Sequence, residues 1–237
     1  MKYKNMGRML VILLIGVIGI THFTSRAEEW ELDVVNEDTQ DTSVADNKEG
    51  LYYYLQKYQY DCAVVYMKEK ISYIAIQLDA YNRLYELGDI TETDLQSCKA
   101  EKKLAEADLQ VALNESDYYN QYLIKNELDY SNYDMTTSKD VKDVEYYMEM
   151  YPEIDYMLFA RYVTDYNNAV VKIQAQKESV SVLETKKKMA SLLFEEGEIS
   201  QLEFAETEVT LAEAKYKLEQ LYVEMNLAFY YLDTLDE

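Results

Sequence analysis

Apolar side chains recur at alternating spacings of three and four residues along several long stretches of the chain. This spacing puts them on one side of an α-helix, where they form the seam that a partner helix covers in a coiled coil. The first seam contains Tyr60, Val64, Met67, Ile71, Ile74, Leu78, Tyr81 and Tyr85. The clearest later seam contains Leu211, Ala214, Leu218, Leu221, Met225, Ala228 and Leu232. The pattern predicts long helices that pack against one another.

Two further seams refine this prediction. A seam from Tyr166 to Phe194 is interrupted by Gln176 and Lys187, so it is weaker than the first. The last helical stretch also carries a second apolar face, formed by Ala205, Val209, Ala212, Tyr216 and Val223. A helix with two apolar faces packs on two sides, as it does inside a bundle or in the wall of a helical barrel.

The chain contains an internal duplication with an offset of 109 residues. This offset places the segment 84–91, Leu-Tyr-Glu-Leu-Gly-Asp-Ile-Thr, onto the segment 193–200, Leu-Phe-Glu-Glu-Gly-Glu-Ile-Ser. The match continues on both sides, where Ile71 aligns with Val180 and Ala105 with Ala214. One helical unit therefore occurs twice.

A tight reversal of the chain is predicted at the centre of each unit. Gly88 and Gly197 suit the left-handed position that follows a helix end. Ser200-Gln201-Leu202-Glu203 then forms a capping box that starts the next helix, and Thr91-Glu92-Thr93-Asp94 is its near equivalent. Hydrophobic staples are expected between Ile199 and Phe204 and between Ile90 and Leu95. Each unit is thus predicted to be an antiparallel helical hairpin.

These signals give an all-α fold of two tandem hairpins in a coiled-coil or four-helix arrangement, with the first hairpin at 51–124 and the second at 152–237. Residues 125–151 are polar without a clean period, which predicts a connector with one short helix. Pro152 is expected in the first turn of the second hairpin, where its missing N–H costs nothing. Residues 28–50 are rich in acidic and small polar side chains, which predicts a flexible leader.

The N-terminus has the features of a targeting segment. Basic residues precede the apolar run Met9 to Ile20, and Ser25-Arg26-Ala27 provides a cleavage site of the small-x-small type. Residues 1–27 are therefore predicted to be a signal peptide, with a short uncleaved N-terminal anchor as the alternative. The protein is expected to be exported and to act outside the cytoplasm, in the cell envelope.

Composition narrows the functional classes. The net charge of −22 repels nucleic acid. The charge indicates a solvated acidic surface on the helices. The functional alternative is that the acidic residues line the lumen of a channel and attract cations. The only histidine, His22, lies in the targeting segment. We therefore expect no catalytic residues, no cofactor and no metal site. Cys62 and Cys98 are predicted to be free thiols, because the hairpin register separates them along the helices by roughly 24 Å at 1.5 Å per residue.

The ordered turns resemble those of the TolC family of outer-membrane efflux proteins. That family has two repeats, each with a long helical hairpin whose turn carries a glycine before a small cluster of apolar and polar residues. Leu87-Gly88-Asp89-Ile90 and Glu196-Gly197-Glu198-Ile199 look like those turns. Tyr151-Pro152-Glu153-Ile154 is similar to the Asn-Pro-Glu-Leu that often opens a repeat there. The likeness covers roughly residues 51–124 and 148–235.

One feature of the family is missing from the sequence. Members carry transmembrane β-strands of about 10 alternating residues in each repeat, and nothing between the two units here has that pattern. The resemblance therefore implies a truncated member without the β-barrel.

The resemblance also implies a function and partners. It implies an efflux or export component that docks an adaptor (membrane-fusion) protein at its hairpin tips. The assembly would also contain an inner-membrane transporter, for example of the ABC type. The chain itself would form a homo-oligomer, which is a trimer in the family. The implied partner-binding residues are Leu87, Gly88, Asp89, Ile90, Glu196, Gly197, Glu198 and Ile199. An exported coiled-coil scaffold or surface-binding protein with no transport role is the alternative.

Overall fold

The computed structural model describes residues 48–234, and within them the chain forms five helices and no strand. They are α2 (Lys48–Glu86), α3 (Glu92–Lys125), α4 (Val144–Met150), α5 (Tyr156–Glu195) and α6 (Gln201–Thr234). The predicted all-α class is confirmed for this part of the chain. None of the described helices combines the length and the apolar character needed to cross a bilayer. The predicted signal peptide and most of the predicted leader, residues 1–47, lie outside the described residues.

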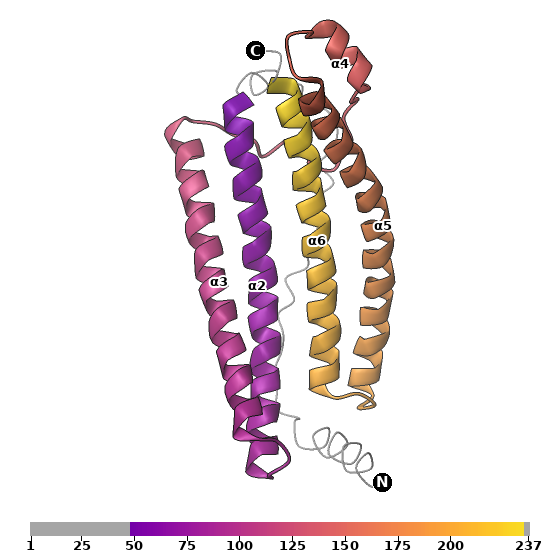
Figure 1. Cartoon of the computed structure of the whole chain (residues 1–237). Coiled ribbons are helices and arrows are strands. Elements are labelled where there is room, and N and C mark those ends of the chain that lie inside the picture. Colours follow the sequence, from indigo (N-terminus) through magenta and orange to yellow (C-terminus); the bar gives the residue numbers. More distant parts are fainter. Residues whose placement is uncertain (1–47, 235–237) are drawn as a thin grey trace.

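The four long helices form a single row in the order α3, α2, α6, α5 (Figure 1). Helices α2 and α3 make one antiparallel hairpin, α5 and α6 make the other, and the two hairpins meet through α2 and α6. Both hairpin turns lie at the same end of the row, and α4 lies at the opposite end (Figure 1). Helices α2 and α6 each have a neighbour on both sides, which confirms the two-sided packing expected for α6.

The duplication seen in the sequence is also a duplication of structure. Shifted by 109 residues, α3 has the same bounds as α6, and α2 has those of α5 to within one residue. Tyr53 stacks on Tyr122 with ring centroids 3.6 Å apart, and their counterparts Tyr162 and Tyr231 stack at 5.1 Å. The two hairpins therefore share one helix register.

Each hairpin is held by apolar contacts along the predicted seam, and two of the core clusters correspond through the same offset. The first cluster includes Ile71, Ile74 and Ala105, and the second includes Val180, Leu183 and Ala214. Burial of such side chains stabilises a fold by about 1.5–3 kcal/mol for each large aliphatic residue.

The two polar interruptions of the α5 seam are also explained. The Gln176 amide donates to the Ala214 carbonyl of α6 at 2.8 Å, and the Lys187 ammonium lies 3.0 Å from the Glu208 carboxylate. Both residues therefore face α6 and replace apolar contacts with polar ones.

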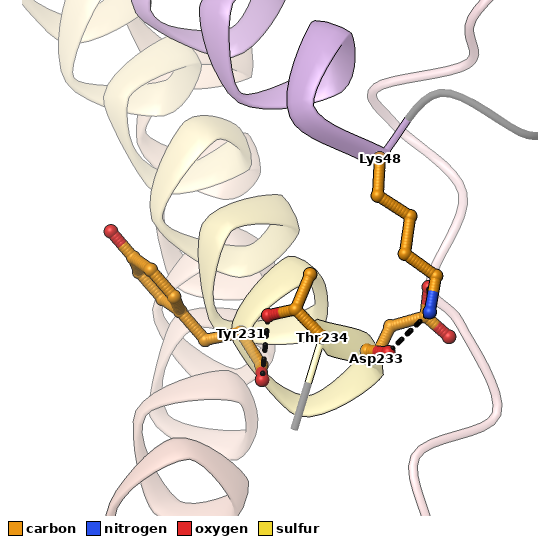
Figure 2. Close-up of polar contacts among 4 residues, drawn as sticks. All are labelled: Lys48, Tyr231, Asp233 and Thr234. Atoms are coloured by element: carbon orange, nitrogen blue, oxygen red, sulfur yellow. Dashed lines mark hydrogen bonds and ion pairs between the residues drawn. The ribbon is translucent and has the colours of Figure 1, made fainter. Parts of the chain in front are cut away.

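The contact between the hairpins has an apolar core, in which buried Leu55 of α2 clusters with Val223 and Met225 of α6, and aromatic and polar contacts beside it. Tyr66 of α2 stacks on Tyr216 of α6 with ring centroids 5.1 Å apart, and the Tyr58 hydroxyl donates to the Glu219 carboxylate at 2.6 Å. At the end of the row away from the turns, the Lys48 ammonium donates to the Asp233 carbonyl at 2.7 Å (Figure 2). These contacts lie between about the middle of α2 and α6 and the ends that are farther from the turns, and they hold the two hairpins side by side there.

Two boundaries differ from the prediction, and the predicted short helix of the connector is present. Helix α2 begins at Lys48, so residues 48–50 of the predicted leader are helical. The connector contains the expected short helix, α4, which packs on α5 through Tyr147 and Phe159. The expected place of Pro152 is wrong, because α5 begins only at Tyr156, where the Asp155 carboxylate accepts a hydrogen bond from the Met157 N–H. Pro152 instead follows the end of α4, and the residue before a proline disfavours helical geometry.

The connector between the hairpins is anchored in the core, although its sequence is polar. Asn226 of α6 is fully buried; its amide donates to the Met135 carbonyl at 2.9 Å and accepts from the Tyr133 hydroxyl at 2.8 Å. The Tyr166 hydroxyl of α5 accepts from the Lys139 N–H at 2.5 Å and donates to the Lys139 carbonyl at 2.7 Å. These bonds satisfy backbone groups that would otherwise be buried without partners.

Candidate functional site: the hairpin tips

The first tip, residues 87–90, is a helix-ending turn built around Gly88. This glycine has φ +77°, the left-handed conformation that side chains with a Cβ disfavour. The Gly88 N–H donates to the Tyr85 carbonyl at 3.0 Å, and the Asp89 N–H donates to the Leu84 carbonyl at 2.9 Å. This pair of hydrogen bonds is the Schellman motif, which satisfies the last carbonyls of α2.

The second tip, residues 196–199, has the same geometry. Gly197 has φ +75°, its N–H donates to the Phe194 carbonyl at 3.0 Å, and the Glu198 N–H donates to the Leu193 carbonyl at 2.8 Å. The predicted left-handed glycines are thus confirmed at both tips.

Both predicted capping boxes are formed. The Asp94 N–H donates to the Thr91 hydroxyl, and the Asp94 carboxylate accepts from the Thr91 N–H at 2.9 Å. Hydrogen bonds from Thr91 hold the pKa of the Asp94 carboxyl below its usual range. At the second tip, the Glu203 carboxylate accepts from the Ser200 N–H at 2.8 Å. The helix that follows each turn, α3 or α6, therefore begins with local hydrogen bonds that do not depend on the rest of the fold.

The tips combine exposed apolar and acidic groups. Leu87 is 73% exposed, Asp89 and Glu198 are exposed, and the two staple isoleucines, Ile90 and Ile199, are half-buried. The predicted site residues fall into two groups of four at the same end of the row, and each group is contiguous (Figure 1). They do not form one joint pocket; they form two neighbouring projections.

Further exposed side chains near the tips were not part of the predicted site. Tyr85 and Phe194 occupy equivalent positions one turn before each tip, and both are partly exposed. Phe194 stacks on Phe204 across its turn with ring centroids 5.2 Å apart. Leu192 and Met189 are more exposed still. The exposure of Met189 and Leu192 could be suspected from the sequence, because these two residues lie off the seam that faces α6, whereas Tyr85 and Phe194 lie at the ends of predicted seams.

The charge at the tips is acidic. Glu86, Asp89, Glu92 and Asp94 surround the first tip, and Glu195, Glu196, Glu198 and Glu203 surround the second. The nearest basic side chain in α2, Arg83, is already paired with Asp79 at 2.7 Å. The geometry suits a partner that presents an apolar contact flanked by basic side chains.

The cysteines have the environment of structural thiols. Both are free, as predicted. Burial, followed by the charge of Glu219, raises the pKa of Cys62 to about 12, and burial raises the pKa of Cys98. Reactive cysteines have lowered pKa values because the thiolate is the nucleophile. Cys62 and Cys98 are therefore poor nucleophiles at neutral pH.

Other parts of the described surface offer little for small-molecule chemistry. Residues 48–234 contain no cluster of three or more histidine, cysteine or acidic side chains placed to hold a metal ion. A depression of about 590 Å³ lies between the connector and α5, lined in part by Ser138, Gln174 and Lys177. It is open to solvent.

The chain matches no known protein family, no curated protein and no solved structure. The likeness to the TolC family therefore rests on the turn motifs and on their duplication.

Proposed function

We propose that this protein is a TolC-like cell-envelope component of an efflux or export assembly, which docks an adaptor protein through its two hairpin tips. The proposal is supported by the pair of matched tips, which have the same turn and the same capping box and lie at the same end of the helical row. Two equivalent projections can bind two equivalent elements of a partner.

The chemistry of the tips supports this role. The first tip has an exposed apolar residue, Leu87, and both tips have exposed carboxylates that would attract a basic partner and steer its approach. The partner in this proposal is an adaptor of the membrane-fusion type, which links the chain to an inner-membrane transporter, for example of the ABC type. The site of action is extracytoplasmic, and the proposed route is export through the N-terminal segment.

A scaffold or surface-binding protein with no transport role is the second candidate. The observation that favours it is the long, acidic row of helices with many exposed side chains, on which the depressions beside the connector and between α2 and α3 are open to solvent. The two candidates differ in geometry. A channel component requires the rows of several chains to close around a lumen, whereas a scaffold does not.

Charge reversal at the tips tests the proposal. Asp89→Lys and Glu198→Lys change exposed side chains, so stability should change by about 0.5 kcal/mol or less. The matched control is Glu106→Lys, an exposed position near the middle of α3. Affinity for the adaptor encoded beside this gene, measured by calorimetry, should fall by about tenfold or more in the double tip variant.

The control determines how a negative result is interpreted. If binding is unchanged in the tip variant and is lost in Glu106→Lys, the side of the hairpin is the interface and the tip proposal fails. If the wild-type chain does not bind the adaptor at all, the scaffold candidate replaces the transport role.

A further inference from the structure

Tyr53 of α2 and Tyr122 of α3 form an unusually close pair of rings. Their ring centroids are 3.6 Å apart and the ring planes differ by 7°, so the two rings lie face to face. Among the described residues, the other ring pairs in contact have centroids at least 5.1 Å apart. Aromatic pairs generally prefer an offset or edge-to-face arrangement with centroids about 4.5–7 Å apart. The packing of α2 against α3 therefore holds this pair in a geometry that free rings avoid.

The pair lies at the open end of the first hairpin. The turn joins α2 to α3 after Glu86, whereas Tyr53 is near the start of α2 and Tyr122 is near the end of α3 (Figure 1). Cys62 of α2 and Cys98 of α3 are free thiols, so no disulfide joins these two helices. A covalent link between the two rings would connect the helices where the turn does not.

The hydroxyl of Tyr122 has a proton acceptor beside it. It donates a hydrogen bond to the carboxylate of Glu49, which lies one turn before Tyr53 in α2. Burial, followed by this hydrogen bond, raises the pKa of Tyr122, so the phenol is neutral at neutral pH. A phenol that loses an electron becomes a strong acid, and a carboxylate within hydrogen-bond reach can accept its proton. Glu49 therefore favours the formation of a neutral phenoxyl radical at Tyr122.

We propose that Tyr53 and Tyr122 are a site of oxidative cross-linking, at which a haem peroxidase and hydrogen peroxide join the two rings as dityrosine. Each phenol loses one electron and its hydroxyl proton and becomes a phenoxyl radical. The two electrons and two protons reduce one molecule of hydrogen peroxide to two of water. A carbon–carbon bond then forms between the ring carbons ortho to the two hydroxyls. The hydrogen on each of these carbons moves to the ring's oxygen, which restores both phenols.

The face-to-face geometry selects this pair among the tyrosines of the chain. In a phenoxyl radical the unpaired electron occupies a π orbital that is perpendicular to the ring and has density on the ortho carbons. Two parallel rings in close contact point these orbitals at each other. In an edge-to-face pair, such as Tyr118 and Tyr119 with planes at 77°, the orbitals of the two rings do not meet.

The second hairpin contains an internal comparison. Tyr162 and Tyr231 are the counterparts of Tyr53 and Tyr122, but their centroids are 5.1 Å apart and their planes are inclined by 20°. These rings must therefore move farther before a carbon–carbon bond can form. We expect the first hairpin to be cross-linked in preference to the second.

The cross-link would act as a clamp on the open end of the first hairpin. It would turn the chain between residues 53 and 122 into a covalent loop, whose ends stay together even in the unfolded state. Such a constraint reduces the conformational entropy of the unfolded chain and so stabilises the fold. The inference does not depend on the transport role, because it involves neither the hairpin tips nor an adaptor.

Peroxidase treatment of the full-length protein tests the inference. Incubation with a haem peroxidase and hydrogen peroxide should give a single-chain product that has lost two hydrogen atoms in mass and shows dityrosine fluorescence. Digestion with trypsin, followed by mass spectrometry, should then find the peptide 49–57 joined to the peptide 104–125.

Single substitutions identify the tyrosines that are linked. Tyr53→Phe and Tyr122→Phe keep the stacked ring but remove the phenol, so each variant should lose the joined peptide. The matched controls are Tyr52→Phe and Tyr119→Phe, which change a neighbouring tyrosine in the same two peptides and should leave the joined peptide in place. Circular dichroism should show the same helix content in all four variants.

Urea denaturation tests the effect of the link on the fold. The purified cross-linked protein should unfold at a higher urea concentration than the untreated protein. Tyr53→Phe treated in the same way should show no such shift, which separates the effect of the link from other oxidation. An unchanged midpoint in the cross-linked protein would mean that the link does not clamp the hairpin.

Three results of the mapping experiment would overturn the inference. The first is the absence of the joined peptide from the treated wild-type protein. The second is a joined peptide that persists in Tyr53→Phe or in Tyr122→Phe. The third is a larger yield of dityrosine between Tyr162 and Tyr231, or between chains, than between Tyr53 and Tyr122.

Discussion

At the scale of single residues, Asn226 is the polar group on which the position of the connector most depends. It is fully buried and uses its amide oxygen for Tyr133 and its amide nitrogen for the carbonyls of Met135 and Tyr222. A buried acceptor or donor that loses its partner costs about 1–3 kcal/mol. The side chain therefore couples α6 to a segment 91 residues earlier in the chain.

Replacing this asparagine should destabilise the protein strongly. Asn226→Ala is expected to lower the free energy of unfolding by about 2–4 kcal/mol, because the Met135 carbonyl and the Tyr133 hydroxyl stay buried without their partner. Urea denaturation followed by circular dichroism measures the change. The matched control is Asn132→Ala, an exposed asparagine of the connector, which should change stability by about 0.5 kcal/mol or less.

The double variant Asn226→Ala with Tyr133→Phe separates the hydrogen bond from other effects. The two changes should be non-additive, because the second removes a group that the first has already left unpaired. Additive costs would mean that Tyr133 and Asn226 act independently.

This residue could not be predicted from the sequence. Asn226 lies beside Met225 of the α6 seam, where a polar residue is normally taken as solvent-facing. Its burial depends on the connector, whose own sequence has no clean period. By contrast, the two cysteines could be assigned as free thiols, because helix rise alone separates them.

At the scale of helices and turns, the chain uses left-handed residues at three helix ends. Gly88 and Gly197 close α2 and α5, and Glu127, with φ 54°, closes α3 with the same hydrogen-bond pattern. A Cβ added at either glycine would meet no atom within 4 Å, so only backbone strain opposes a side chain there.

Substitution should lower the stability of the protein at the two glycines and raise it at Glu127. Gly88→Ala and Gly197→Ala are each expected to lower the free energy of unfolding by about 1–2 kcal/mol, the cost of a left-handed residue with a Cβ. Glu127→Gly should relieve that strain and raise stability by up to about 1 kcal/mol. Thermal unfolding of the three variants measures these shifts.

A glycine inside a helix is the control. Glu106→Gly should destabilise α3 by about 1 kcal/mol, so a gain at position 127 can be assigned to its backbone conformation. A loss of stability in Glu127→Gly as large as that in Glu106→Gly would contradict this account.

Turns and caps could be predicted because their chemistry is local. The turn glycine, the cap hydroxyl and the acid three residues later lie within a few positions of one another, and the hydrogen bonds of the turn and the cap are local. The sequence motif alone is therefore enough to predict this structure. The predicted start of α5 at Pro152 was wrong for a related reason. Pro152 and Asp155 are both helix-start signals, and only Asp155 has a carboxylate that caps the N–H of Met157.

At the scale of the whole molecule, the arrangement of the helices is an open row in place of a closed bundle. In a closed four-helix bundle, α3 and α5 would also cover each other. Here they lie at the two ends of the row (Figure 1). Both helices have exposed apolar side chains, such as Leu104 on α3 and Val182 on α5. In the open row, the outward faces of α3 and α5 have no partner among the described helices.

This arrangement could be predicted only in part. The spacing of apolar residues shows how many faces a helix buries, and it indicated correctly that α6 packs on two sides. It does not show which helix covers a given face, since α2 and α5 carry equivalent faces and either could meet α6 from that side. The contact of Tyr66 with Tyr216 settles that choice.

In this fold the two hairpins lie side by side through α2 and α6, and α3 and α5 lie on the outside. The most direct measurement is cross-linking between cysteines placed at Tyr66 and Tyr216, whose rings are 5.1 Å apart, in a chain with Cys62→Ser and Cys98→Ala. Treatment with a short bis-maleimide, followed by mass spectrometry, should give a single chain linked internally between α2 and α6. If this pair is not linked within the chain, while cysteines at Ala107 and Ala175 are, α3 packs on α5 in the same molecule and the open row is wrong.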